Sequence, residues 1–163
     1  MRVSSVLKLI FYMCILCVFT LHAQNNINYY FKTLDIKDGL SQNTVNAILQ
    51  DKQGFLWFGT KDGLNRFDGL SFRIFKKEES DLGNNFITAL YEDKEGSIWV
   101  GTDAGVFVYD PVSEAFTHFD VISDTGNIIE RAVTMITEDE NNAIWISVDY
   151  QGLFCYSHKQ LTN

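Results

Sequence analysis

Polar and aromatic side chains recur at one place in this sequence, four or five residues after Trp57, Trp99 and Trp145. Carboxylates accept hydrogen bonds from hydroxyl groups, and an aromatic ring offers an apolar face on which a ligand can stack. These side chains are therefore the candidates for ligand binding: Lys61, Asp62, Asp103, Asp149 and Tyr150. The alternative is that they only make turns, because Asp62 and Gly63 form a strong turn dipeptide without any ligand.

The residue pattern does not predict catalysis. His22, His118 and His158 are scattered, whereas a metal site needs clustered ligands and a nucleophile needs a neighbouring base. The acidic turns that begin at Asp51 and Asp93 are too short for a calcium loop with alternating oxygen ligands. We therefore expect no catalytic residue, no metal and no cofactor in this segment.

The candidate side chains are positioned by three copies of one pattern. The copies begin at Asp51, Asp93 and Asp139, and each carries its tryptophan six residues later. A repeat of about 40–50 residues, built from short β-branched and aromatic runs, is typical of β-propeller blades. Asp at the first position and Gly54 or Gly96 at the fourth favour a tight turn. The tryptophans are expected to have a structural role, with their rings buried between neighbouring blades.

This pattern predicts an all-β chain that forms part of a β-propeller. We expect about three antiparallel four-stranded blades in an open ring, over residues 44–79, 80–121 and 122–163. The third blade is expected to be incomplete and to lack its fourth strand. Residues 24–43 are expected to hold a separate N-terminal strand, over Tyr30–Leu34. Because a propeller needs about 4–8 blades to close, the sequence is interpreted as a piece of a longer protein.

The first 23 residues have the pattern of a secretory signal. Arg2 and Lys8 supply positive charge, Leu9 to Leu21 is a nearly unbroken apolar run, and Ala23 is a small residue at a plausible cleavage point. The apolar run is short for a membrane span, which needs about 20 residues. An uncleaved anchor is the alternative.

The cysteine count and the net charge agree with export and disfavour one class of partner. Cys14 and Cys17 lie in the signal, so Cys155 is the single cysteine after it and cannot form an internal disulfide. Export without disulfides suits a bacterial periplasm or cell surface. The net charge of −8 disfavours nucleic acid as a partner.

The motifs of the first two copies resemble the two-component regulator propeller repeat, and the resemblance covers nearly all of the chain after the signal. The first copy reads Asn43-Thr-Val45, Asp51-x-x-Gly54-x-Leu-Trp57-x-Gly59-Thr, Asp62-Gly-Leu64 and Arg66-Phe67-Asp68-Gly69. The second copy repeats most of this from Asn85 to Asp110. The third copy departs from it, because Ser147 replaces the glycine after the tryptophan and Gln151 lengthens the next turn.

The resemblance implies a function in signalling. In that family the propellers form the periplasmic sensor of hybrid two-component systems, and many of these sensors bind oligosaccharides and switch on genes for degrading glycans. The chain would then be an N-terminal fragment of such a sensor, on the periplasmic side of the inner membrane. Its parent would be a histidine kinase. The expected partners are the remaining propeller blades, a possible oligosaccharide ligand and a second copy of the parent in a homodimer.

Two other interpretations stay open. The chain could be a fragment of a secreted propeller enzyme that acts on glycans, with catalytic carboxylates on other blades. It could also be a truncated remnant without a function of its own. The coding sequence downstream of Asn163 separates the three interpretations.

Overall fold

The computed structural model describes residues 6–8, 10–13 and 29–163. The chain divides into two compact units, Met1–Thr33 and Leu34–Asn163; in the first, residues 6–8 and 10–13 are helical. Most of the expected signal therefore lies outside the described residues. Among the residues that the structure does describe, no helix has the length and apolar character to cross a membrane.

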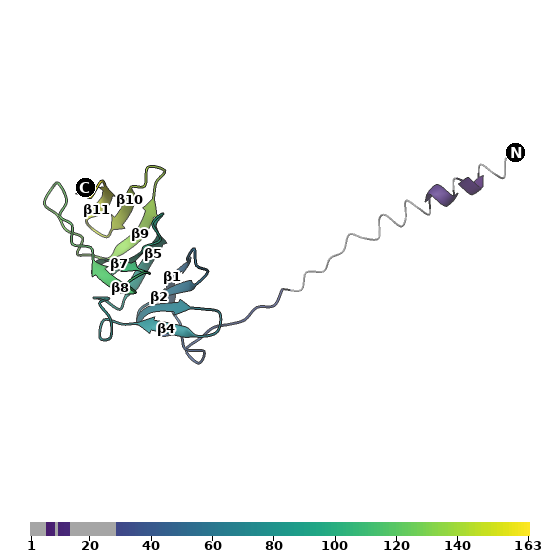
Figure 1. The fold of residues 1–163 in the computed structure, drawn as a ribbon, viewed down its shortest axis with the longest axis horizontal. Coiled ribbons are helices and arrows are strands. Elements are labelled where there is room, and N and C mark those ends of the chain that lie inside the picture. Colours follow the sequence, from purple (N-terminus) through teal and green to yellow (C-terminus); the bar gives the residue numbers. More distant parts are fainter. Residues whose placement is uncertain (1–5, 9, 14–28) are drawn as a thin grey trace. The chain divides into compact units, whose positions relative to one another are not determined.

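The second unit consists of three antiparallel sheets of four strands each, and within each sheet the strands lie side by side in chain order (Figure 1). The first sheet contains β1 (Val45–Gln50), β2 (Leu56–Thr60), β3 (Gly63–Phe67) and β4 (Phe72–Phe75). The second contains β5 (Ile87–Glu92), β6 (Ile98–Thr102), β7 (Gly105–Asp110) and β8 (Ala115–His118). The third contains β9 (Val133–Glu138), β10 (Ile144–Val148), β11 (Gly152–Ser157) and β12 (Gln160–Thr162).

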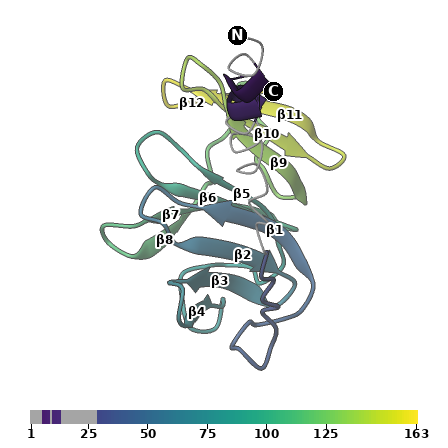
Figure 2. The same cartoon turned by 90° about the vertical axis from the view of Figure 1, so that its right-hand side faces the viewer.

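The three sheets are arranged as consecutive propeller blades. The first strands of the blades are neighbours, because β1 contacts β5 and β5 contacts β9, and Figure 2 shows the three sheets one after another. In the described part of the chain the blades do not close into a ring. The structure thus confirms the expected partial β-propeller.

The apolar core consists of two clusters, one at each junction between blades. At the first junction Trp57 packs with Tyr109 of the next blade, with ring centroids 5.1 Å apart. At the second junction Trp99 packs with Tyr156, at 5.9 Å. Both of these tryptophans are buried, whereas Trp145 of the third blade is only half-buried. The stability of each blade therefore depends on its neighbours.

The aspartate that opens each copy holds both the turn and the tryptophan. The indole Nε1 of Trp57 donates to Asp51 Oδ2 at 2.7 Å, and the other carboxylate oxygen accepts the backbone N–H of Phe55 at 2.9 Å. The same two bonds recur from Asp93 and Asp139. In the third copy they hold the pKa of Asp139 below its usual value, chiefly through the bond from the indole. The sequence analysis predicted the turn but not the bond to the indole.

The third sheet has a fourth strand, which the sequence analysis did not find. Strand β12 has only three residues, and it pairs with β11 with Tyr156 opposite Leu161, whose side chain is buried. The connecting turn uses His158 and Lys159 with φ of 51° and 62°. Hairpin turns with positive φ usually contain glycine, asparagine or aspartate, and neither histidine nor lysine is typical there. The sequence therefore contains no signal for this hairpin.

No strand forms over Tyr30–Leu34, contrary to the expectation. Tyr30 and Phe31 are almost fully exposed, and the segment pairs with none of the three sheets, so its backbone lacks the partner that a strand requires. The chain is attached to the first blade further on, where Leu40 is buried and Ser41 N donates to Asn65 Oδ1 at 2.8 Å.

Candidate functional site

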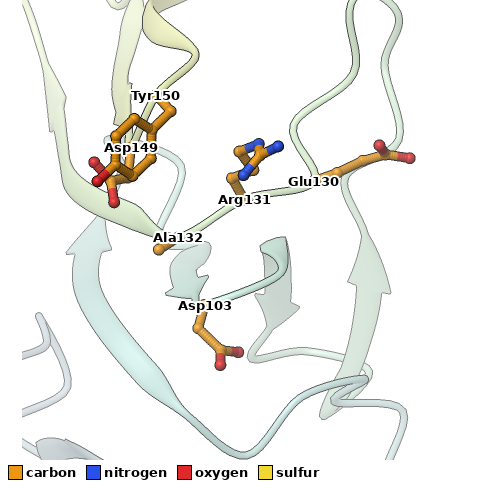
Figure 3. A pocket seen from close by; sticks show the side chains of 6 residues that line it. All are labelled: Asp103, Glu130, Arg131, Ala132, Asp149 and Tyr150. Atoms are coloured by element: carbon orange, nitrogen blue, oxygen red, sulfur yellow. The ribbon is translucent and has the colours of Figure 1, made fainter.

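A recess with a volume of about 410 Å³ lies at one end of the second and third blades (Figure 3). It contains three of the five residues that the sequence analysis singled out as ligand-binding candidates. The residues that line it are Asp103, Glu130, Arg131, Ala132, Asp149 and Tyr150. Their role in binding stays a prediction.

Two hairpin turns and one connecting segment meet at this recess. Asp103 lies in the turn between β6 and β7, and Asp149 lies in the turn between β10 and β11. Because neighbouring strands are antiparallel, both turns fall at the end of the blades where β9 begins. The chain before β9 therefore passes both turns and supplies Glu130, Arg131 and Ala132.

Backbone hydrogen bonds fix the turns to the connecting segment. Asp149 N donates to Ala132 O at 2.8 Å within the third blade, and Gly105 N donates to Arg131 O at 3.2 Å across the two blades. Residue 105 must be glycine, because its φ is 109° and an added Cβ would lie 2.8 Å from Ile129 O. The turns of the two blades are thus joined to the segment that lines the recess.

Tyr150 is the most exposed aromatic side chain at the recess, with 90% of its surface accessible. Its φ of 56° is unusual for a residue other than glycine, asparagine or aspartate. The following Gln151 joins this turn to the segment before β9, because its Nε2 donates to Ile128 O at 2.8 Å and its Oε1 accepts Glu130 N at 3.3 Å. Such strained positions cluster at functional sites.

The charged groups of the recess are available to a ligand. Three carboxylates, Asp103, Glu130 and Asp149, and a single cation, Arg131, line the recess, which leaves a formal charge of −2. Within the described part of the chain, none of the four forms an ion pair. The side chains extend from different sides of the recess in Figure 3. Together they offer several hydrogen-bond acceptors, one bidentate donor and one aromatic face.

The other two candidates, Lys61 and Asp62, do not line this recess. They belong to the corresponding turn of the first blade, where Lys76 Nζ donates to Asp62 Oδ2 at 2.8 Å. This bond raises the pKa of Lys76 above its usual value. The ammonium of Lys61 lies 5.3 Å from the centre of the Phe86 ring. Both side chains therefore have partners within the protein.

Sequence reasoning missed Glu130 and Arg131, although the repeat contained a signal for one of them. Asn43 and Asn85 stand two residues before the first strand of their blades, and their side chains accept backbone N–H groups of the preceding loops. In the third copy Arg131 takes this position. Arg131 and the inserted Gln151 are both departures from the repeat; Arg131 lines the recess, and Gln151 accepts a hydrogen bond from the backbone of Glu130, which lines it too.

The described residues contain no group of three or more histidine, cysteine, aspartate or glutamate side chains that could hold a metal ion. The recess therefore presents hydrogen-bonding groups and one exposed aromatic ring.

Comparison with known proteins identifies the repeat. Residues 39–62 and 81–104 match the family described as two component regulator propeller. A stretch of 62 residues is 52% identical to Histidine kinase P4 of Formosa agariphila, and this match covers 38% of the chain and 4% of that protein.

Two solved structures from B. thetaiotaomicron share the fold. The extracellular domain of BT3049, described as a hybrid two component system, has a TM-score of 0.73 and 32% identity over 83% of this chain. The extracellular domain of BT4673 has a TM-score of 0.67 and 28% identity over 78% of this chain. The chain spans 20% and 19% of the lengths of these two structures.

In its fold the chain is similar to extracellular propeller domains of two-component systems. The chain carries repeats of the two-component regulator propeller family.

Proposed function

We propose that the chain is part of an extracytoplasmic ligand sensor of a hybrid two-component system, and that the recess binds an oligosaccharide. The observation that carries the proposal is the coincidence of the two departures from the repeat. Arg131 lines the recess beside the exposed Tyr150, and Gln151 is hydrogen-bonded to Glu130, which also lines it.

The size and the chemistry of the recess support a small polar ligand. Its volume of about 410 Å³ falls in the range of ligand pockets, roughly 300–1,000 Å³. The Tyr150 ring offers a stacking surface, the carboxylates of Asp103 and Asp149 accept hydroxyl protons, and Arg131 donates to ring or hydroxyl oxygens. The formal charge of −2 favours a neutral sugar chain over a uronate or a sulfated one.

The signalling part of the proposal concerns the longer protein. We place the chain near the N-terminus of that protein, on the periplasmic side of the inner membrane, with the remaining blades completing the sensor. A dimeric parent with a histidine kinase would convert binding into control of glycan-utilisation genes. The matches to extracellular domains of two-component systems and to a histidine kinase support this proposal.

Calorimetric titration of the complete exported region with a set of neutral oligosaccharides tests the binding site. For a ligand that binds the wild type, we expect Tyr150→Ala to weaken binding by about tenfold or more, since a lost stacking contact costs on the order of 1.4 kcal/mol. Asp149→Asn should weaken it as well, because the amide accepts fewer hydroxyl hydrogen bonds than the carboxylate.

Lys61→Ala is the matched control, because Lys61 occupies the corresponding turn of the first blade, outside the recess. Wild-type affinity in both recess variants would show that the ligand binds elsewhere. Failure of every oligosaccharide to bind would reject the proposed ligand class.

The coding sequence after Asn163 tests the signalling part. Further repeats followed by a membrane span and a kinase are the expected continuation. A glycosidase-like continuation would contradict the sensor.

A further inference from the structure

One face of the third blade is left uncovered, although the same face is covered in the other two blades. We call it the open face, and define it by the following residues: Met135, Trp145, Ser147, Leu153 and Cys155. Met135 and Leu153 are 60% and 53% exposed. The residues at the corresponding positions of the second blade, Ala89 and Val106, are buried against the third blade.

The two junctions present in the structure are built alike and leave no room for a side chain at one position. A Cβ added to Gly59 would lie 2.6 Å from Ile87 Cγ2 of the next blade. A Cβ added to Gly101 would lie 2.7 Å from Val133 Cγ1. Each junction therefore pairs a glycine on one blade with a β-branched residue at the start of the next blade's first strand.

The open face breaks this pairing, because Ser147 stands where the other blades have glycine. At the other two junctions a Cβ in this position would overlap Ile87 or Val133, and here the Oγ of Ser147 accepts a hydrogen bond from Thr134 Oγ1 at 2.9 Å. A blade with isoleucine or valine at that position could not pack here at the same distance. A blade with a small residue could.

The third copy also differs in the charged residue that the first two copies use to contact the next blade, at the end of the junction away from the glycine. Lys52 Nζ donates to Asp93 O at 2.6 Å, and Lys52 N donates to Glu92 Oε2 at 2.9 Å across the first junction. At the second junction Lys94 Nζ donates to Asn142 Oδ1 and lies 4.0 Å from Glu138 Oε1. In the third copy Glu140 takes the place of these lysines. A carboxylate at the position of Glu92 and Glu138 would then face a second carboxylate, which is unfavourable.

We propose that the open face is covered by a further blade of the same repeat whose complementary positions are altered to match. That blade carries glycine or alanine where Ile87 and Val133 stand, and a basic or uncharged residue where Glu92 and Glu138 stand. The inference rests on the proposal that the chain continues in a longer protein. The same junction geometry recurs at both junctions of the structure, which supports this inference. The BT3049 structure, of which the chain spans a fifth, supports it too.

Cys155 is a reporter for this face, because it is half-buried and pairs with Trp145 across β10 and β11. The experiment follows the native alkylation rate of Cys155 by a maleimide in the full-length protein, with Cys14 and Cys17 replaced by serine. We expect the wild type to react at least about tenfold more slowly than the urea-unfolded protein, since a covered thiol reacts only through local opening. Ser147→Val should raise the native rate several-fold, because its methyl groups hold the next blade away.

Thr134→Val is the matched control. It removes the hydrogen bond to Ser147 Oγ without adding bulk at residue 147, and we expect a rate close to that of the wild type. A native rate equal to the unfolded rate would show that nothing covers the face. If the protection of Cys155 from alkylation disappears on dilution, a second copy of the chain covers the face. An unchanged alkylation rate in Ser147→Val would contradict the proposed pairing of Ser147 with a small residue of the next blade. Because the readout needs no ligand, failure here is distinct from failure of the sensor proposal.

Discussion

At the scale of single residues, one carboxylate in each copy does two tasks. It closes the turn by accepting backbone N–H groups, and it accepts the indole proton of the tryptophan six residues later. A buried indole without an acceptor is costly, so the aspartate allows a large ring to be buried at the junction between blades. This explains why aspartate and tryptophan recur together in the three copies.

Asp93→Asn tests this double role. Asp93 is buried, and its two oxygens accept from Trp99 Nε1 at 2.7 Å and from Ser97 N at 2.8 Å. An amide has one acceptor oxygen, so one donor is left unsatisfied, and we expect a loss of about 1–3 kcal/mol in the free energy of local opening. Amide hydrogen exchange of the second blade measures this loss.

Asp120→Asn, at an exposed position, serves as the control and should change the opening free energy by less than about 0.5 kcal/mol. Equal exchange in the two variants would show that the bond to the indole is not a source of stability.

At the scale of elements, the unit of structure is the junction between two blades rather than the single blade. The apolar clusters each combine residues of two blades, and the glycine after the tryptophan lets the next inner strand approach. Repeat proteins commonly gain stability from such neighbour contacts. The recess belongs to this level too, because residues of two blades line it.

Gly101→Ala tests the close approach at the second junction. The new Cβ would lie 2.7 Å from Val133 Cγ1, so we expect a cost of about 1–3 kcal/mol from overpacking. In a Val133→Ala background the same substitution should cost less, because the closest clashing methyl group is gone and only the contact with the Cβ of residue 133, at 2.9 Å, remains. A double-mutant cycle by hydrogen exchange measures the difference. Additive effects would indicate that the strands move apart without using this contact.

At the scale of the whole molecule, the blades expose apolar side chains on two outer faces. Ile48 of the first blade is 64% exposed, and Met135 of the third blade is 60% exposed. The described residues therefore resemble a stack of blades with uncovered ends. Terminal repeats without a polar outer face tend to associate.

We expect residues 24–163 on their own to self-associate as the protein concentration rises, because burial of these faces is favourable. Sedimentation velocity over a range of concentrations measures this. A monomer at every concentration, with a sharp and reversible thermal transition, would show that the three blades are sufficient by themselves.

The sequence by itself determined the blades, because strand alternation, turn residues and the tryptophan period are local and recur in register. It also singled out Asp103, Asp149 and Tyr150 from their place after each tryptophan; these three line the recess, and their role in binding stays a prediction. It could not identify the three-residue strand β12, whose turn lacks the usual residues, or the position of Lys61 and Asp62 outside the recess. Only the tertiary structure decided which turns meet, because the recess depends on how the second and third blades pack. The tertiary structure also placed Arg131 at the recess and Ser147 on the uncovered face of the third blade. Both residues depart from the repeat, and the effect of such a departure depends on the residues that lie opposite it in space.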